Sequence, residues 1–180
     1  MTEQDILNLI KIDPWMMGVL HIAEKLNLPD WMIGAGFVRN KVWDHLHGYE
    51  KKPETADVDL IYFDPQGNDE KQDDALSKKL ESETGIPWEI VNEFYAHVWN
   101  NIPPYTSSTD AISQWSETAT SVGVRSRNSE LELIAPHGID DLVNLIVRPT
   151  PTFRSKLEKV KVRIEKKQWL EKWPKLRLAF

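Results

Sequence analysis

Two aspartates separated by one valine, Asp57 and Asp59 in the segment DVDLIYF, constrain this chain more than any other feature. Side chains alternate between the two faces of a β-strand, so Asp57 and Asp59 are predicted to share one face, about 6.6 Å apart along the strand. Val58 and Leu60 then point into a core and fix the direction of the carboxylates. Two carboxylates this close repel each other unless a cation lies between them. Two Mg²⁺ ions about 3.5 to 4 Å apart are the arrangement used for displacement at phosphorus.

A glycine turn lies a little over twenty residues upstream. Gly34, Ala35 and Gly36 follow the short apolar run WMI and precede a helical pattern, FVRNKVWDHLHG. Gly34 and Gly36 let the backbone approach phosphate oxygens, free N–H groups at the helix start supply donors, and Arg39 lies in the first turn. Both motifs are therefore predicted to face one triphosphate.

The same pattern also suggests a dinucleotide site. A strand, a Gly-x-Gly turn and an acidic residue about twenty positions later belong to the Rossmann fingerprint. Arg39, however, occupies the position of the third glycine, where helix and strand must pack closely. Two predicted helices precede the first strand, and too little chain remains for a second mononucleotide-binding half. We therefore rank this interpretation well behind the metal site.

The composition limits the kind of protein and the kind of metal site that this chain can form. With 180 residues, 41% hydrophobic and 28% charged, the chain is expected to form one globular domain. Its expected parts are the N-terminal helices (1–30), the catalytic sheet and helices (31–135) and the C-terminal helices (136–180). Cysteine is absent, so any metal must be held by oxygen or imidazole. The apolar runs are too short for a membrane span and the start is not signal-like, so we expect a soluble cytoplasmic protein without membrane contact.

A basic C-terminal segment contrasts with an acidic body. From Arg154 to Arg177 ten Lys or Arg accompany three Glu, so this segment carries +7 and the rest −13, for a total of −6. An acidic body suits a long nucleic acid poorly, so a small molecule or a protein is the expected acceptor. Apolar residues recur at helical spacing from Phe153 to Ile164. This favours an amphipathic helix packed on the body, with a solvated charged face, over nucleic-acid docking.

The rest of the chain predicts an α+β order. Thr2 is expected to cap a helix over Asp5 to Ile10, and Asp13 with Pro14 to start a second helix. Further along we expect a helix over roughly 74–84, a strand WEIVN, a short helix DAISQW capped by Ser108 or Thr109, a hairpin of TSVGVRS with LELIA, a helix GIDDLVNLIV, and the closing basic helix.

These motifs also carry a family resemblance. AGFVRNKVWDHLHG followed by DVDL resembles the Gly-Gly-x-Val-Arg-Asp…Asp-x-Asp signature of the DNA polymerase β-like nucleotidyltransferase superfamily, found in tRNA CCA-adding and poly(A) polymerases. From about Trp31 to Trp173 the chain is similar to a compact bacterial nucleotidyltransferase-like family, notably in PWEIVNEFYAHVW, SQWSETATSVGVR and APHGIDDLVNLIVRPTP. The resemblance implies an α+β, polymerase β-like nucleotidyltransferase fold, with a small mixed or antiparallel sheet flanked by helices and with N- and C-terminal helices.

The resemblance also implies a third carboxylate on the neighbouring strand, where Glu89 in WEIVN is the matching residue. Adjacent strands lie about 4.8 Å apart, so an inward-facing Glu89 can reach the same metals. The alternative is a solvated glutamate on a sheet face. Ala35 stands where the superfamily commonly has glycine, and Asn40 where the tRNA enzymes have aspartate, which puts tRNA-type specificity in doubt.

Together these features predict an enzyme that transfers a nucleotidyl group from a nucleoside triphosphate (NTP) to an acceptor hydroxyl. Its expected cofactor is a pair of Mg²⁺ ions. Asp57, Asp59 and Glu89 are its expected catalytic and metal-binding residues. The two glycines of the turn and Arg39 are expected to hold the phosphates. Two alternatives stay open: a catalytically inactive nucleotide- or partner-binding protein of the same fold, and an antitoxin-like enzyme that modifies a protein tyrosine.

Overall fold

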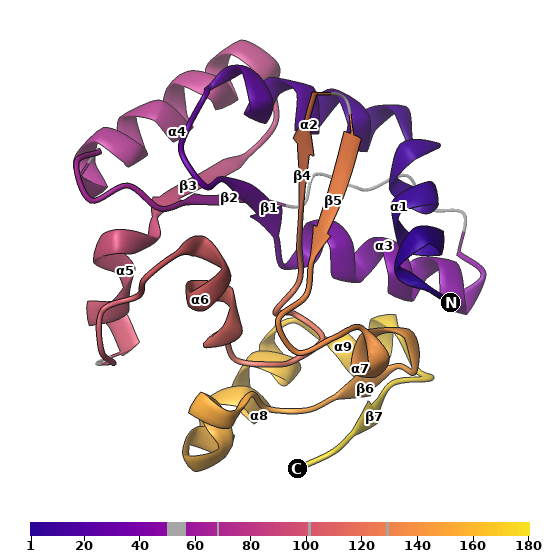
Figure 1. Ribbon diagram of the computed structural model, residues 1–180. Coiled ribbons are helices and arrows are strands. Elements are labelled where there is room, and N and C mark those ends of the chain that lie inside the picture. Colours follow the sequence, from indigo (N-terminus) through magenta and orange to yellow (C-terminus); the bar gives the residue numbers. More distant parts are fainter. Residues whose placement is uncertain (50–56, 68, 101, 129) are drawn as a thin grey trace.

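The centre of the chain is a five-stranded mixed sheet with the order β3-β2-β1-β4-β5 (Figure 1). The computed structural model describes residues 1–49, 57–67, 69–100, 102–128 and 130–180. The strands are β1 (Met32–Gly34), β2 (Val58–Tyr62), β3 (Trp88–Asn92), β4 (Gly123–Arg127) and β5 (Glu130–Ile134). β2 and β3 are parallel, whereas the other neighbouring strands are antiparallel. The predicted α+β class and the predicted hairpin of β4 with β5 are confirmed.

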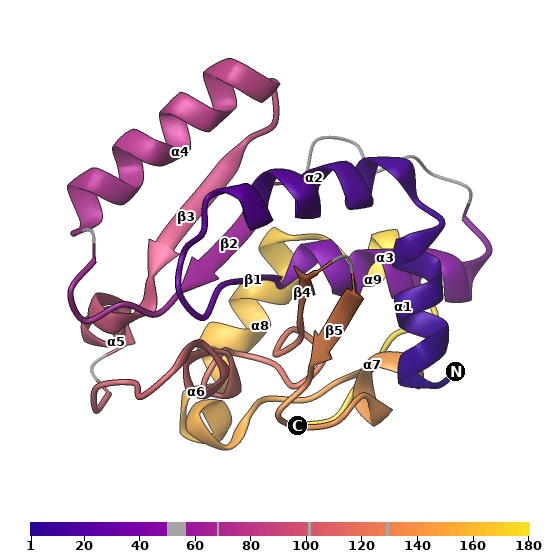
Figure 2. The same cartoon turned by 45° about the horizontal axis from the view of Figure 1, so that its top comes forward.

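Helices flank this sheet on both sides. They are α1 (Glu3–Lys11), α2 (Pro14–Lys25), α3 (Gly36–His47), α4 (Glu70–Thr84), α5 (Glu93–Asn100), α6 (Ser108–Ser113), α7 (Asp140–Val143), the 3-10 helix η1 (Pro151–Lys156), α8 (Leu157–Lys166) and α9 (Trp169–Lys172). In Figure 1, α2 lies above the sheet and α8 and α9 lie below it, and Figure 2 shows α4 running beside the edge strand β3. No single helix of the described residues is long and apolar enough to cross a membrane; α1 and α2 reach that length and composition only as a pair bent by 92°.

Local sequence explains where several helices begin or end. The Thr2 hydroxyl accepts a hydrogen bond from the Asp5 amide in a capping box. The Asp13 carboxylate accepts hydrogen bonds from two backbone amides at the start of α2, where Pro14 is the first residue. Gly48 ends α3 at a φ of 72°, a left-handed conformation that glycine adopts without strain. The predicted boundaries of these helices are thus confirmed within a few residues.

Three local predictions are wrong, and one helix was not predicted. Ser107, not Ser108 or Thr109, caps α6 by accepting from the Asp110 amide. The predicted helix GIDDLVNLIV stops at Val143, because the chain turns at Leu145 with a φ of 58°. The next residues form β6 (Ile146–Val147), which pairs in parallel with β7 (Arg177–Leu178). The residues after β3, for which no element was predicted, form α5. The closing basic helix is divided into η1, α8 and α9.

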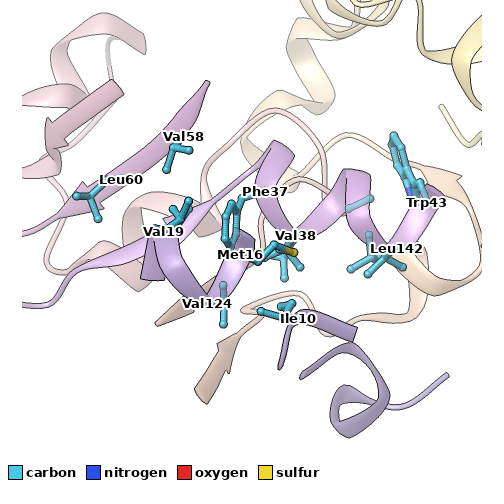
Figure 3. Packing of buried hydrophobic residues seen from close by; sticks show 14 of the residues in the cluster. Ile10, Met16, Val19, Phe37, Val38, Trp43, Val58, Leu60, Val124 and Leu142 are labelled. Carbon is cyan, nitrogen blue, oxygen red and sulfur yellow. The ribbon is translucent and has the colours of Figure 1, made fainter. Parts of the chain in front are cut away.

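The core determines which face of the sheet is free for a site. Val58 and Leu60 are fully buried in the main apolar cluster, as predicted, together with side chains from α1, α2, α3 and β4 (Figure 3). Residues of the opposite sheet face, such as Met32 and Ile61, join Ile112 of α6 in a smaller cluster. Asp59 lies between Val58 and Leu60 in the strand, so its side chain points to this second face, away from the main core.

Candidate active site

Asp59 and Glu89 lie side by side on the second face of the sheet. β2 and β3 are parallel and in register, and Asp59 is the direct partner of Glu89. The antiparallel register of β1 with β2 places Gly34 on the other side of Asp59. Asp57 immediately precedes β2, and its side chain is exposed. The three predicted carboxylates are therefore gathered at one end of two adjacent strands.

A cavity of about 370 Å³ opens beside these carboxylates. Five of the six residues predicted for the site line it: Asp57, Asp59, Glu89, Gly36 and Arg39. The C-terminal elements line it as well, with the cations Arg163, Lys167 and Lys172. Carboxylates and cations thus share one cavity, which is the arrangement needed where a metal ion meets a phosphate chain.

These three cations were not predicted as site residues. The sequence pattern predicted that α8 packs on the body, and Val160 and Ile164 are indeed buried. The charged face of α8 is largely exposed to solvent, and at its C-terminal end two cations also line the cavity: Arg163 lies on α8 and Lys167 directly follows it. The signal in the sequence was the excess of positive charge near the end of an otherwise acidic chain.

Gly34 is the one predicted site residue that does not line this cavity. An added Cβ at Gly34 would lie 2.7 Å from Cη2 of Trp115. The missing side chain makes room for the indole, which packs against β1. Gly34 therefore positions Trp115 beside the carboxylate row.

The turn between β1 and α3 is strained at Ala35. This residue has φ 51° and ψ −119°, a conformation that favours glycine, and it is only 7% exposed. The side chain of Ala35 does not cap α3, so the first amides of that helix keep their capacity to bind an anion. Ala35 and Gly36 both line the cavity, which brings the helix start to the site.

Ala35→Gly is expected to raise the free energy of unfolding by about 1 kcal/mol. Strain of about 1 to 3 kcal/mol at such a position exceeds the entropy that glycine adds to the unfolded chain. The measurement is the urea midpoint, compared with Gln168→Gly. Gln168 has an ordinary left-handed conformation (φ 54°, ψ 40°), so its gain should be smaller. A lower urea midpoint for Ala35→Gly than for the unmodified chain would contradict the strain.

Arg39 is built into the wall of the cavity rather than projecting freely. It is 5% exposed, and its Nη1 donates to the Thr120 hydroxyl at 2.9 Å while its Nη2 donates to Asn40 Oδ1 at 2.9 Å. The guanidinium lies 4.3 Å from the ring centroid of Trp169. Burial lowers the pKa of Arg39 to about 10, so the side chain remains cationic at neutral pH.

A buried carboxylate positions Arg163. Glu117 is fully buried, and its Oε1 lies 3.5 Å from Nε of Arg163. Burial raises the pKa of Glu117, while the charges of Arg163 and Arg39 act against this rise. The side chain of Arg163 is 37% exposed and lines the cavity beside Asp59 and Glu89. Glu117 therefore anchors a cation that lines the cavity.

Asp59 carries an unneutralised charge in this arrangement. Burial, followed by the charge of Glu89, raises the pKa of Asp59 to about 6, although Arg39 and Arg163 pull it down. In the part of the chain that the structure describes, no three His, Cys, Asp or Glu side chains already stand close enough to hold a metal ion. The carboxylate pair nevertheless has the ligand type and the electrostatic need for a hard cation.

A second cavity of about 350 Å³ meets the first at the same carboxylates, and both are lined by Ala35, Asp59, Glu89 and Arg163. Three aromatic side chains, Trp99, Trp115 and Phe153, line its other walls together with aliphatic, polar and charged residues, and we call it the aromatic cavity. The carboxylates thus lie between a cationic cavity and an aromatic one.

Comparison with known proteins finds matches that cover most of the chain. A family model described as Nucleotidyltransferase matches residues 21–178. None of the curated proteins matches the chain. A solved structure described as a CCA-adding enzyme head domain is 36% identical, covers 99% of this chain and 96% of its own, and has a TM-score of 0.89.

Two longer enzymes share the fold at lower identity. The Thermotoga maritima CCA-adding enzyme complexed with tRNA is 14% identical and has a TM-score of 0.60, covering 100% of this chain and 43% of its own. A CCA-adding enzyme in complex with CTP is 13% identical and has a TM-score of 0.61, covering 100% of this chain and 44% of its own. The chain spans less than half the length of these two enzymes. The implied polymerase β-like nucleotidyltransferase fold is confirmed by the head-domain match.

Proposed function

This chain belongs to the nucleotidyltransferase family, and we propose from that premise that it transfers a nucleotidyl group from an NTP to an acceptor hydroxyl, with Mg²⁺ as cofactor. The observation that carries the proposal is the in-register pair Asp59 and Glu89, placed where the cationic and the aromatic cavity meet. The longer relatives of this fold in complex with CTP and with ATP make an NTP the natural donor.

The three carboxylates are the residues that would hold Mg²⁺. The raised pKa of Asp59 reflects a desolvated carboxylate beside Glu89 and Asp57, and a divalent cation would neutralise this group. Mg²⁺ in such enzymes is held by one or two carboxylates together with oxygens of the substrate phosphates. In the described residues no three such side chains are yet close enough together to hold a metal ion, which is compatible with a site that is completed by the oxygens of the NTP. Bound Mg²⁺ would supply neutralisation of phosphate charge and polarisation of the acceptor oxygen.

The triphosphate is proposed to lie in the cationic cavity. Gly36 and the following amides face it from the uncapped start of α3, and Arg163, Lys167 and Lys172 face it from the C-terminal elements. Arg39 adds positive charge from the wall while it joins α3 to Thr120 and Trp169. In this proposal the phosphates are contacted both by the glycine turn, as predicted from the sequence, and by cations more than one hundred residues later in the chain.

The reaction proposed is an in-line displacement at the α-phosphorus. The acceptor oxygen forms a bond to this phosphorus, and the bond to the bridging oxygen of the β-phosphate breaks. Glu89 is exposed and lies beside Asp59, so it can accept the proton of the acceptor hydroxyl. Pyrophosphate leaves on the side of the cationic cavity, where Lys167 and Lys172 stabilise its charge.

The acceptor side is proposed to begin beyond Glu89. Glu89 also lines a hollow of about 550 Å³ between α4 and β3. Exposed acidic side chains of α4, including Glu70, Asp74 and Glu81, line this hollow and outnumber its one lining cation, Lys78. Such a rim repels a polyanion, so we propose a small molecule or a protein as the acceptor rather than a long nucleic acid.

The deciding experiment is a thermal-shift panel of the four NTPs with and without Mg²⁺, followed by a screen for pyrophosphate release with hydroxyl compounds, proteins and tRNA as acceptors. An NTP at 100 times its Kd should stabilise the fold by about 2.7 kcal/mol. Binding without pyrophosphate release from any acceptor would favour the inactive binding protein. Release only with a protein that carries an accessible tyrosine would favour the antitoxin-like enzyme.

A matched pair of lysines tests the location of the phosphates in the same assay. Lys167→Ala should weaken NTP binding roughly tenfold, through loss of one charged contact of about 1.5 kcal/mol. Lys166→Ala removes the same charge from the neighbouring residue, which does not line the cavity, and should change the Kd by less than about twofold. Equal effects of the two changes would contradict the proposed phosphate site.

A further inference from the structure

The aromatic cavity has the properties of a nucleobase site. Trp99, Trp115 and Phe153 offer flat faces on which a base can stack, and the volume of about 350 Å³ lies within the usual range for small-ligand sites. The cavity begins at Asp59 and Glu89, where the α-phosphate is proposed to lie. A nucleoside attached to that phosphate, with its triphosphate in the cationic cavity, would therefore extend into the aromatic one.

Two charged side chains that line this cavity, the exposed Lys159 and the buried Glu93, have no role in the reaction described above. Glu93 is the first residue of α5, is 4% exposed, and lines the cavity. Burial raises the pKa of Glu93 to about 7, and the hydrogen bond with the Trp115 side chain opposes this rise. In the described part of the chain no Lys, Arg or His forms an ion pair with it. A buried carboxylate without a countercharge is stabilised by hydrogen-bond donors, which a ligand in the cavity can supply.

We propose that this cavity binds the nucleobase of the NTP and that Glu93 selects guanine. The pairing edge of guanine presents two adjacent donors, N1–H and N2–H, which the two oxygens of one carboxylate can accept together. Adenine and cytosine present one donor next to an acceptor, and uracil presents one donor between two acceptors, so each would place an acceptor against a carboxylate oxygen. Trp115 holds the carboxyl group of Glu93 and stacks on the base. The inference rests on the proposed function and adds its donor substrate, GTP.

The competing explanation is purely structural. An acidic residue in the first turn of a helix is favourable by itself, and Glu93 occupies that position in α5. In that case its removal would weaken the fold and affect every NTP alike. A role in base selection would instead change the order of preference among bases.

The experiment measures the Kd of GTP, ITP, ATP, CTP and UTP with Mg²⁺ at pH 8, where Glu93 is ionised, for the unmodified chain and for Glu93→Gln. The unmodified chain should bind GTP roughly 10-fold to 100-fold more tightly than ATP, CTP or UTP, the discrimination expected of one bidentate pair. ITP lacks the N2 amino group, so it should bind at least about fivefold more weakly than GTP. Glu93→Gln should weaken GTP binding at least about tenfold and change the Kd of the other three by less than about threefold.

Controls separate failure of this inference from failure of the proposed function. Glu130→Gln makes the same change at an exposed position of β5 and should leave all five Kd values unchanged. Equal binding of all NTPs, preference for another base, or a uniform loss in Glu93→Gln would overturn guanine selection while the transferase proposal stands. Absence of binding by every NTP would overturn both. Should Glu93→Gln not fold, the comparison of GTP with ITP on the unmodified chain decides the question.

Discussion

Asp59→Asn should leave the chain folded, make it more stable above pH 6, and slow nucleotidyl transfer by roughly 10³-fold or more. The loss of rate corresponds to the several kcal/mol that metal ions contribute to such reactions. The Mg²⁺-dependent part of NTP stabilisation should vanish, because an amide is a poor ligand for this ion. A substitution that stabilises the fold while it abolishes the reaction is unusual. This combination would show that the charge of Asp59 is kept for function at a cost in stability.

The gain in stability follows from the pKa of Asp59. Burial and the neighbouring Glu89 raise this pKa from 3.8 to about 6, so the folded chain holds the proton more tightly than the unfolded chain between these values. The free energy of unfolding of the unmodified chain therefore falls as the pH rises from about 4 to 6, by as much as about 3 kcal/mol at about 1.4 kcal/mol per pH unit. Asp59→Asn escapes this loss. The difference between the two proteins should be full above pH 6 and should disappear below about pH 4.

Thermal unfolding in the presence of EDTA at pH 4, 6 and 8 measures this difference, and titration with Mg²⁺ and an NTP at pH 8 measures the metal dependence. Asp140→Asn is the matched control, because Asp140 is exposed on α7 and outside both cavities. It should shift the free energy of unfolding by less than about 0.5 kcal/mol at every pH. An Asp59→Asn protein that is no more stable at pH 8, or that keeps its Mg²⁺ response, would exclude the proposed role of this carboxylate.

The sequence predicted elements whose determinants are local. Thr2, Asp13 and Gly48 hold helix ends through contacts within a few residues, and the alternation around Val58 and Leu60 fixes which face of β2 carries the carboxylates. α5 was missed because β3 continues into it with no glycine or proline between them. The helix around Val143 was predicted too long because Leu145, an ordinary apolar residue, takes a left-handed conformation that no local pattern indicates.

The cations of the site could not be predicted for a different reason. Periodicity shows which face of α8 is buried, but it does not show what lies opposite the polar face. Arg163 reaches the carboxylates only because Glu117, a buried residue more than forty positions earlier, pairs with it across the fold. Trp115 packs on Gly34, and this contact depends on the path of the chain between α6 and β4. Such long-range pairings decide the shape of the site.

Glu89→Gln should keep NTP affinity within about tenfold but slow pyrophosphate release by roughly 10² or more. The amide preserves the size of the side chain, and the phosphate contacts from Gly36, Lys167 and Lys172 remain. It can no longer accept the proton of the acceptor hydroxyl or share a cation with Asp59, which is the loss expected for a positioned acid–base or metal-orienting group. Pyrophosphate release is measured at saturating NTP with the acceptor that gives the highest rate in the screen, and the Kd of the NTP is measured separately.

The role of Glu89 is decided by comparing the effect of Glu89→Gln on the rate of pyrophosphate release with its effect on the Kd of the NTP. Glu130→Gln carries the same loss of charge on the exposed side of β5 and should leave both quantities unchanged, which excludes a general effect of net charge. A rate equal to that of the unmodified chain would remove Glu89 from the catalytic set and leave Asp57 and Asp59 as its carboxylates. A large loss of affinity at an unchanged rate would show that Glu89 contributes equally to the ground state and the transition state, so its place beside Asp59 would serve NTP binding alone.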